Sequence, residues 1–387
     1  MKVDWNVKYL TVAAYSFIVI ALSIVFYLIT SQLTMFTAQI HIFYQTMLPI
    51  IIGASMAYLF NFILEKVEGK IITPATKGKI KLKKKRAISM LITYAIVFTL
   101  LYIFTLVLFP QLVTSVVKFV NEVTDNFDEI SLMVTNFIAR INLRPDYMEY
   151  VTEWWQGILE QAFEFLKGLV PIIGNIVRIL FSSIWNIVLG IVVSVYLLFE
   201  KEKFKAQIKK ITYAVFSKKR ADRTVELTKR ADTIFGRFLS GKILDSLIIG
   251  ILTYIVLITF GIPFPILVSF IIGITNIIPF FGPFIGGVPS FFIILIISPI
   301  KALWFILIIV VIQQIDGNII GPKILGDSLG VSAFWILFSL LIAGKFLGLI
   351  GLIIGVPLFV FIYSIIKDNV ETKLAKRGLP IETKHYI

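Results

Sequence analysis

Long uncharged apolar runs alternate along the chain with short segments rich in charge. Four runs reach the roughly 20 residues that a helix needs to cross about 30 Å of bilayer hydrocarbon. These predicted spans cover residues 9–29, 42–64, 87–109 and 179–199. The first is longer than the apolar core of a signal peptide, and no small-residue cleavage site follows it, so we expect it to remain in the mature protein.

The second half of the chain is apolar but interrupted. A fifth predicted span, residues 243–260, is followed by an uncharged stretch up to Lys301 that is too long for one crossing. Glycine and proline punctuate this stretch and the later run 332–366. We expect residues 264–298 and 332–366 to form re-entrant or tight helical hairpins on either side of one crossing at 302–319. In the alternative threading, both segments are single long, kinked crossings.

The placement of charge predicts how these spans are oriented. Residues 66–86 contain nine Lys or Arg and one Glu, and residues 200–242 contain thirteen basic and five acidic residues. Residues 110–174 instead contain nine acidic and four basic residues. Because basic residues accumulate in cytoplasmic loops, we expect the first two segments and both termini inside and the third segment outside. The formal net charge of +14 then follows from topology, and we expect no nucleic-acid partner.

Two polar segments between the spans have helical patterns. Apolar residues of the outer segment recur at spacings of three and four, which predicts amphipathic helices. These residues are Phe119, Val123, Phe127 and Ile130. The helices would form a small cap or lie on the membrane, or alternatively make oligomer contacts or a vestibule. The inner segment, 201–242, predicts one or two basic helices along anionic headgroups, or a solvated connector.

Together these patterns predict an all-α polytopic membrane protein with about eight membrane segments, some of them broken or re-entrant. The lipid bilayer is then its main partner. The expected parts are residues 1–109 with three transmembrane helices and a basic cytoplasmic loop at 65–86, an extracytoplasmic amphipathic helical segment at 110–175, a transmembrane helix with a basic cytoplasmic helical segment at 176–242, a C-terminal core of broken helices at 243–366, and a cytoplasmic tail at 367–387.

The composition removes most enzymatic chemistry. The chain has no Cys and two His, His41 and His385, which stand at no metal-binding spacing. It contains no HExxH motif, no GxSG motif, and no Walker A or Rossmann glycine pattern. We therefore expect no enzyme, no catalytic residue, no bound metal and no cofactor, and any coupled process must use an ion gradient.

Two polar segments of the second half predict cavities. An unpaired amide or carbonyl is costly inside a bilayer, so irregular backbone is tolerated there only where protein or a hydrated cavity surrounds it. The segments are residues 273–283, with Asn276-Ile-Ile-Pro-Phe-Phe-Gly, and residues 313–327, with Asp316-Gly-Asn-Ile-Ile-Gly-Pro. The expected helix-breaking residues are Pro279, Gly282, Pro283, Gly317, Pro322 and Gly326.

Asp316 is the leading functional residue, because a carboxylate within the bilayer must be paired, hydrated or protonated. A structural ion pair or a helix cap is the alternative. Gln313, Asn276 and Asn318 would line a hydrated route, or would join helices by hydrogen bonds. Asp245 lies one turn into its span beside a lysine, where it is either an ion site or half of an interfacial ion pair.

Several motifs of the second half occur together. They are Asn276-Ile-Ile-Pro-Phe-Phe-Gly-Pro, Gly-Asn318-Ile-Ile-Gly-Pro-Lys-Ile-Leu-Gly, Leu329-Gly-Val-Ser, and the segment 348–357. Together these motifs resemble those of the autoinducer-2 exporter family of bacterial permeases. The order of apolar and polar segments over nearly the whole chain resembles that family as well. The resemblance implies a multi-pass transporter of the bacterial plasma (inner) membrane with cytoplasmic termini, which assembles as a homo-oligomer, a pentamer by family expectation. Family members are assigned to export of the quorum-sensing furanone autoinducer-2, and some to antiport of sodium or lithium against protons.

The chain departs from the family pattern at two positions. Asp316 stands where many members have Glu, so the acid is kept on a shorter side chain, and Gly321 replaces an acid often found before the proline. The leading hypothesis is a secondary transporter that exports a small polar solute or exchanges a monovalent cation such as Na+ for H+ along the five candidate residues. The competing hypothesis is a structural or accessory membrane protein, associated with assembly or sporulation, that transports nothing.

Overall fold

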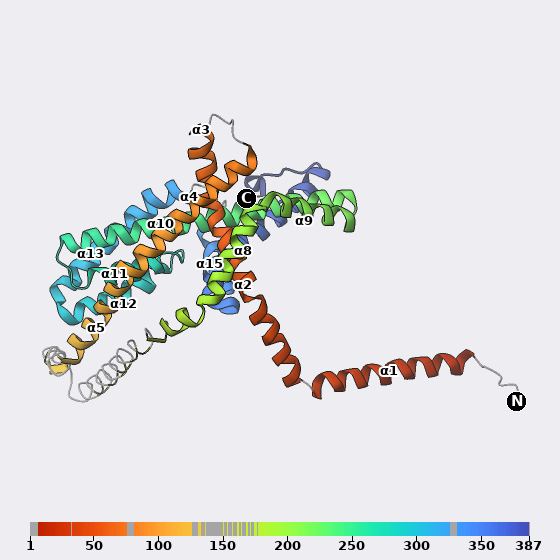
Figure 1. The fold of residues 1–387 in the computed structure, drawn as a ribbon, viewed down its shortest axis with the longest axis horizontal. Coiled ribbons are helices and arrows are strands. Elements are labelled where there is room, and N and C mark those ends of the chain that lie inside the picture. Colours follow the sequence, from red (N-terminus) through yellow and green to blue (C-terminus); the bar gives the residue numbers. More distant parts are fainter. Residues whose placement is uncertain are drawn as a thin grey trace. The chain divides into compact units, whose positions relative to one another are not determined.

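The computed structural model describes residues 7–31, 33–75, 81–125, 177–325 and 331–386, together with single positions between 131 and 175. Within these ranges every regular element is a helix, which confirms the all-α polytopic membrane fold (Figure 1). Among the described residues, five helices are long and apolar enough to cross a membrane, or six if one bent pair counts as a span. Three shorter apolar helices accompany them.

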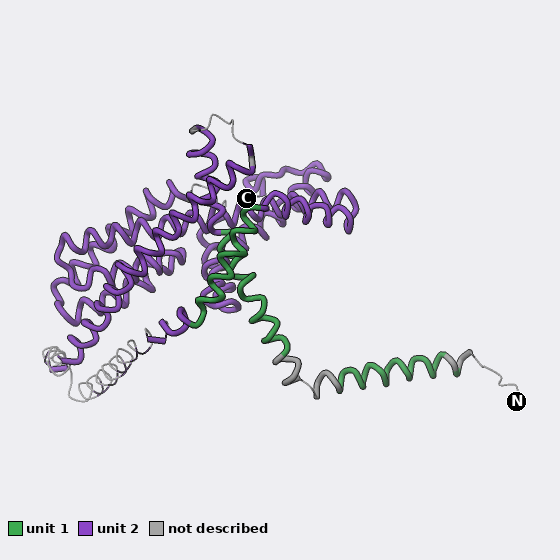
Figure 2. The backbone as a smooth tube through the Cα atoms, in the orientation of Figure 1, with its two compact units in different colours: residues 1–58, 182–199 green, residues 59–181, 200–387 purple. Residues whose placement is uncertain are grey.

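The chain divides into two compact units (Figure 2). The first consists of residues 1–58 and 182–199, and the second of residues 59–181 and 200–387. The first unit holds α1 (Val7–Ser31), most of α2 (Leu33–Lys66) and α8 (Ile184–Phe199). The first, second and fourth predicted spans therefore lie in helices.

Glycines bring α2 and α8 together within the first unit. A Cβ on Gly53 would lie 2.6 Å from Val193 Cβ, and a Cβ on Gly190 would lie 2.8 Å from Ile52 Cγ2. Neither position has room for a larger side chain. Small residues of this kind allow the close backbone approach by which helices associate in lipid.

The second unit begins with the end of α2 and a π-helical segment, η1 (Val67–Ile72), which α3 (Thr73–Ala75) follows. The chain then runs through α4 (Leu82–Ile103), the π-helical η2 (Phe104–Leu108) and α5 (Phe109–Asp125). These last three elements form one long helix that contains the third predicted span.

The apolar face predicted for the outer segment is present in α5. Phe119 and Val123 are buried, and the Phe119 ring packs edge to face against Phe264, with ring centroids 5.5 Å apart. Phe127 and Ile130 lie outside the described residues. The same holds for most of the expected extracytoplasmic segment beyond α5, so its role stays a prediction.

The basic segment 201–242 is helical, as predicted. α9 (Lys201–Val215) and α10 (Lys218–Thr259) are joined through Phe216 and Ser217. α10 is 42 residues long. Its first part is basic, and its second part is the fifth predicted span.

Residues 264–298 form the first predicted hairpin. α11 (Pro265–Thr275) ends at Asn276, and α12 (Gly282–Ile297) returns against it. Proline occupies the first turn of each helix, where its missing N–H has no intrahelical partner to lose. Prolines and glycines thus end and restart helices here, as predicted.

The turn of this hairpin is tight. A Cβ on Gly282 would lie 2.2 Å from the main-chain oxygen of Thr275. Phe280 within the turn has a φ of 61°, a left-handed conformation that is unfavourable for a bulky residue. On its other side α11 packs on α10, where a Cβ on Gly273 would lie 3.1 Å from Gly250 Cα.

The helix after the hairpin stays continuous where the sequence predicted a break. α13 (Pro299–Ile315) runs into η3 (Asp316–Ile320), a π-helical turn, and then into α14 (Gly321–Leu325). The expected irregular segment is therefore a widened helical turn. Pro322 provides a reason, because it has no N–H to continue the α-helical pattern. Gly326 lies outside the described residues.

Residues 332–366 form the second predicted hairpin. α15 (Ala333–Lys376) is interrupted at Gly348, whose φ of 58° and ψ of −136° are not helical. The chain then returns so closely that a Cβ on Gly351 would lie 1.8 Å from the main-chain oxygen of Ala343. The chain path thus follows the threading with two hairpins, while the side of the membrane on which each turn lies stays a prediction. A short 3-10 helix, η4 (Thr383–Tyr386), ends the described chain.

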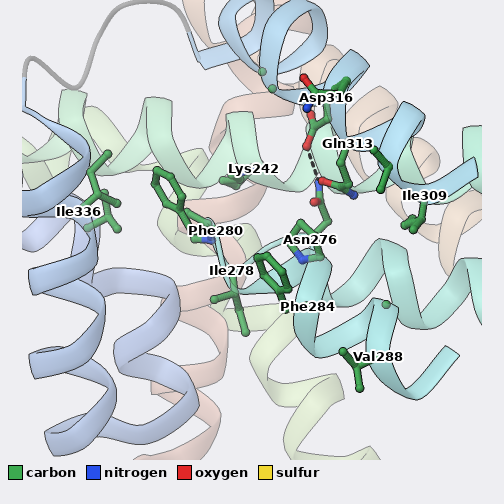
Figure 3. A pocket seen from close by; sticks show the side chains of 18 of the residues that line it. Lys242, Asn276, Ile278, Phe280, Phe284, Val288, Ile309, Gln313, Asp316 and Ile336 are labelled. Atoms are coloured by element: carbon green, nitrogen blue, oxygen red, sulfur yellow. Dashed lines mark hydrogen bonds between the residues drawn. The ribbon is translucent and has the colours of Figure 1, made fainter. Parts of the chain in front are cut away.

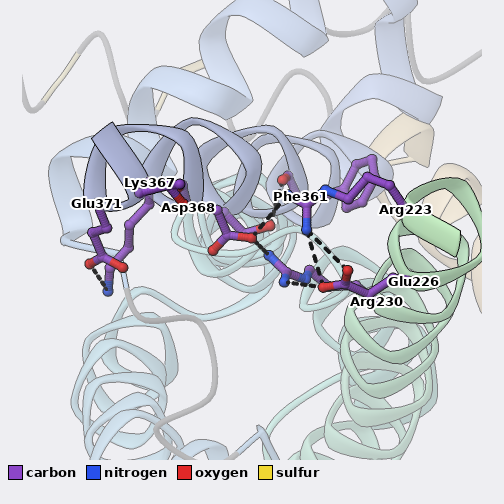
Figure 4. A network of polar contacts seen from close by, with 9 residues as sticks. Arg223, Glu226, Arg230, Phe361, Lys367, Asp368 and Glu371 are labelled. Atoms are coloured by element: carbon purple, nitrogen blue, oxygen red, sulfur yellow. Dashed lines mark hydrogen bonds and ion pairs between the residues drawn. The ribbon is translucent and has the colours of Figure 1, made fainter. Parts of the chain in front are cut away.

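Arginine–carboxylate contacts join α10 to the end of α15 (Figure 4). Asp368 Oδ2 accepts hydrogen bonds from Arg230 at 2.6 Å and from Arg223 at 3.3 Å. Both arginines also contact Glu226 on α10. These side chains are partly exposed, so each pair contributes no more than about 1 kcal/mol, but the shared carboxylate fixes how the two helices meet.

Gly282→Ala should destabilise the first hairpin. The added methyl group would overlap a main-chain oxygen, and overpacking of this kind costs about 1–3 kcal/mol. Gly287→Ala in the same helix is the matched control, since a Cβ there meets nothing within 4 Å. Thermal unfolding in detergent, followed by the monodisperse peak in size-exclusion chromatography, should show a lower midpoint for Gly282→Ala alone. Equal midpoints would contradict the close packing of the turn.

Candidate functional site

Two carboxylates and one amide from three helical elements meet inside the second unit, and Figure 3 shows the amide of Asn276 and one of the two acids, Asp316. Asn276, at the end of α11, donates from Nδ2 to Asp245 Oδ2 on α10 at 3.2 Å and to Asp316 Oδ2 of η3 at 3.4 Å. The exposed fractions of Asp245, Asn276 and Asp316 are 0%, 2% and 7%. One buried amide therefore joins two buried acids that are far apart in the sequence.

Lys242 completes this cluster from the preceding turn of α10. Its Nζ lies 2.8 Å from Asp245 Oδ2, and the two side chains are 11% and 0% exposed. Asp245 is thus paired with a lysine, which was one predicted alternative. The pair is buried within the protein, and its predicted place at the membrane interface stays a prediction.

The cluster has more hydrogen-bonding capacity than it uses. Oδ1 of Asp245, Oδ1 of Asp316 and Nε2 of Gln313 are buried and have no hydrogen-bond partner among the described residues. Two carboxylates also face a single ammonium, which leaves one negative charge in excess when both acids are ionised. Because buried charged oxygens are costly without partners, these oxygens are where a proton, a water molecule or a cation would bind.

A cavity of about 1090 Å³ opens beside the cluster. Its polar wall consists of Lys242, Asn276, Gln313, Gln314 and Asp316. The rest of the lining is mostly apolar and includes six phenylalanines, contributed by α10, α12, α13 and the turn between α11 and α12. A large, mainly apolar cavity with a few convergent polar groups is typical of a small-molecule site.

The structure brings four of the five predicted pathway residues together. Asp316, Gln313 and Asn276 line the cavity, and Asp245 lies behind Asn276. Asn318 does not join them: its side chain is exposed, and its Nδ2 donates to Gln314 at 2.9 Å. In a helix, residues 316 and 318 point in different directions, so they do not share one face.

The predicted helix-breaking residues also gather near the site. Four of them line the cavity, namely Pro279, Pro283, Gly317 and Pro322. Gly282 instead permits the tight turn that holds Asn276 in place. Irregular backbone and the cavity thus coincide, as expected for membrane proteins.

Sequence reasoning missed two kinds of lining residue. Lys242 was expected only as an interfacial partner, although its spacing of three from Asp245 places both on one helix face. Phe280 and Phe284 face the cavity from the turn and α12 (Figure 3). No signal in an apolar run distinguishes such phenylalanines from those that contact lipid.

Comparisons with known proteins agree with this architecture. Residues 17–371 match the family described as AI-2E family transporter. The Bacillus subtilis protein YueF is 25% identical over 347 residues, which are 86% of this chain and 89% of YueF. YrrI of the same organism is 26% identical over 317 residues, 80% of this chain and 82% of YrrI. A Thermotoga maritima relative is 23% identical over 333 residues, 82% of this chain and 96% of the relative. All three are named as candidate transport proteins, and their names give no substrate.

Lys242→Met should destabilise the protein, because it leaves Asp245 buried without its ammonium partner. Breaking a buried ion pair from one side costs on the order of 3–5 kcal/mol in other proteins. The thermal unfolding midpoint in detergent should fall clearly. Adding Asp245→Asn to Lys242→Met should recover part of the loss, since it removes the stranded charge.

Lys203→Met is the matched control for this experiment. Lys203 pairs with Glu200 at 3.0 Å, but the two side chains are 63% and 39% exposed, so the expected change is less than about 1 kcal/mol. If Lys242→Met unfolds at the same temperature as Lys203→Met, the buried pair does not stabilise the core.

Proposed function

Because the chain belongs to the AI-2E family of transporters, a family of multi-pass membrane proteins, we propose that it is a secondary transporter that uses the Asp245–Asn276–Asp316 cluster to exchange a monovalent cation for a proton. The observation that supports this most directly is the pair of buried carboxylates with free Oδ1 atoms beside a single lysine. Protons and small cations are the species that such oxygens bind.

The chemistry of exchange follows from the excess negative charge. A proton on one carboxylate neutralises the cluster, and a monovalent cation between the carboxylate oxygens does the same. Both cannot be held at once without leaving excess positive charge in a poorly hydrated site, so binding of one displaces the other. Asp316 is the residue that exchanges, since it lines the cavity while Asp245 is fully buried and held by Lys242.

The volume and lining of the cavity favour a second candidate, the export of a small polar solute such as autoinducer-2. A space of about 1090 Å³ with one polar wall is far larger than a dehydrated cation needs. In that case the same acids would hydrogen-bond the hydroxyl groups of the solute. The phenylalanine-rich remainder would enclose its carbon skeleton.

The proposal includes the cellular setting. The protein resides in the bacterial plasma membrane with both termini in the cytoplasm, since the basic segments adjoin the second, third, fourth and fifth spans on one side. It assembles as a homo-oligomer, a pentamer by analogy with its family. Disulfide-free single-cysteine variants can test the orientation, because the parent chain has no Cys.

Proton flux in proteoliposomes tests the exchange. An inward sodium gradient is imposed, and a trapped dye reports internal pH for the parent, Asp316→Asn and Asp232→Asn. We expect the parent to move protons against sodium and Asp316→Asn to do so at least about tenfold more slowly, which corresponds to roughly 1.4 kcal/mol of barrier. Asp232→Asn should match the parent, since Asp232 is an exposed acid on α10 away from the cavity.

Two results would contradict the exchange mechanism. A folded Asp316→Asn variant with parental flux would remove Asp316 from the pathway. A folded parent protein that moves no protons under any sodium gradient would exclude exchange of sodium for protons. Uptake of labelled solute by inverted vesicles would then decide between export of a solute and an accessory role without transport.

A further inference from the structure

α9 has a surface that neither the transport cavity nor the packing of the second unit uses. It begins at Lys201, two residues after Phe199, where the apolar run of the fourth span gives way to charge. None of its residues is buried. The sequence therefore places α9 at the edge of a membrane span, on the side predicted to be cytoplasmic.

One face of α9 is an exposed apolar stripe. With 3.6 residues per turn, four apolar side chains at spacings of four, three and four fall within a narrow sector of the helix. They are Phe204, Ile208, Ile211 and Val215, which are 39%, 64%, 63% and 70% exposed. Such a stripe on a helix with no buried residue requires a covering surface.

Lysines flank this stripe on both sides. Lys203 and Lys210 lie on one flank and Lys205 and Lys209 on the other, and all four are exposed. Together with Lys201, α9 has five lysines against a single acid, Glu202. The apolar stripe is thus bordered by positive charge along its length.

The opposite face of α9 is held against α10. Tyr213, half a helical turn away from the centre of the stripe, donates a hydrogen bond from its hydroxyl to Asp222 on α10. The Lys209 ammonium lies 5.9 Å from the centroid of the Tyr213 ring. The hydrogen bond to Asp222 joins α9 to α10 through the side of α9 opposite the apolar stripe, so the stripe points away from this contact.

We propose that α9 is a lipid-binding helix that lies in the cytoplasmic headgroup layer and selects anionic phospholipids. The stripe enters the boundary between headgroups and acyl chains, while the flanking lysines extend to the phosphates. Charge distinguishes this occupant from a second copy of α9, because two surfaces with four exposed lysines each would repel one another. The inference rests on the membrane location of the chain and is independent of what the cavity transports.

Lipid bound at α9 would act on α10, one of the three elements that form the carboxylate cluster. α9 continues through two residues into α10, and α10 provides Lys242 and Asp245. Three further basic residues, Lys218, Lys219 and Arg220, are exposed at the start of α10 and extend the same positive region. Anionic lipid would therefore anchor the start of the helix whose middle holds Lys242 and Asp245.

Site-specific quenching in nanodiscs tests the inference. Ile208→Cys on the stripe and Ala206→Cys on the opposite face, both in the full-length chain, are labelled with an environment-sensitive fluorophore. The nanodiscs contain phosphatidylcholine alone or mixed with phosphatidylglycerol, and lipids with a spin label near the headgroup serve as quenchers. At position 208 we expect a blue shift and strong quenching in the mixed lipid, and much weaker quenching in phosphatidylcholine alone. At position 206 we expect little quenching in either lipid.

A charge variant separates lipid selection from simple burial. Replacing Lys203, Lys205, Lys209 and Lys210 by Gln leaves the stripe intact, and because these side chains are exposed the protein should stay monodisperse. Each lysine near an anionic surface contributes roughly a fivefold gain in affinity. In this variant the dependence of quenching at position 208 on phosphatidylglycerol should disappear.

Three outcomes would overturn the proposal. Equal quenching at positions 206 and 208 would show that α9 has no lipid-facing side. A blue-shifted but unquenched label at position 208 in every lipid would show that another protein surface covers the stripe. Unchanged dependence on phosphatidylglycerol in the four-lysine variant would show that these lysines do not select the lipid.

Discussion

The hydrogen bonds from Asn276 to Asp245 and Asp316 link α10, the end of α11 and η3, and the rest of the second unit is arranged so that they can form. A carboxylate enclosed by apolar helices is tolerated only with donors or a counter-charge close by. Lys242 supplies the counter-charge to Asp245, and the turn after α11 supplies the amide. The close approach of α11 to α10 at Gly250 and Gly273 brings the amide within reach. The polar cluster therefore depends on two glycines in apolar segments, Gly250 and Gly273, because they let α10 and α11 approach closely.

The two hairpins and most residues of the cluster could be predicted from the sequence, whereas the contacts within the cluster could not. Glycine and proline act on their own segment of chain, so the turns after Thr275 and at Gly348 leave a local signal. The approach of Asn276 to acids in other helices depends on how those helices pack, and no local pattern records it. The π turn at η3 shows the same limit, because Pro322 predicts a disturbance there but not whether the helix breaks or widens. Asn318 was grouped with Asp316 because the two are neighbours in sequence, although a helix turns them apart.

Membership of a transporter family and the geometry of the cavity limit the function in different ways. The family match establishes transport by a multi-pass membrane protein but gives no solute, and the named relatives add none. The cavity provides a place for a solute and a chemistry for binding it. Excess acid over base favours cations and protons, while the large phenylalanine-lined volume suits an organic solute. Flux measurements separate these cases because only the first requires countermovement of protons.

The geometry of Asn276 has a consequence for which guests the site prefers. A primary amide has two N–H hydrogens and one carbonyl oxygen, and the bonds to Asp245 and Asp316 use both hydrogens. What this side chain can still offer is its oxygen, which, like the unpaired carboxylate oxygens, can only accept a hydrogen bond or coordinate a cation. Donors to a guest can come from Lys242 and from the side-chain amides of Gln313 and Gln314. Next to Asn276, the wall of the cavity therefore favours guests that present hydrogen or positive charge over guests that present lone pairs.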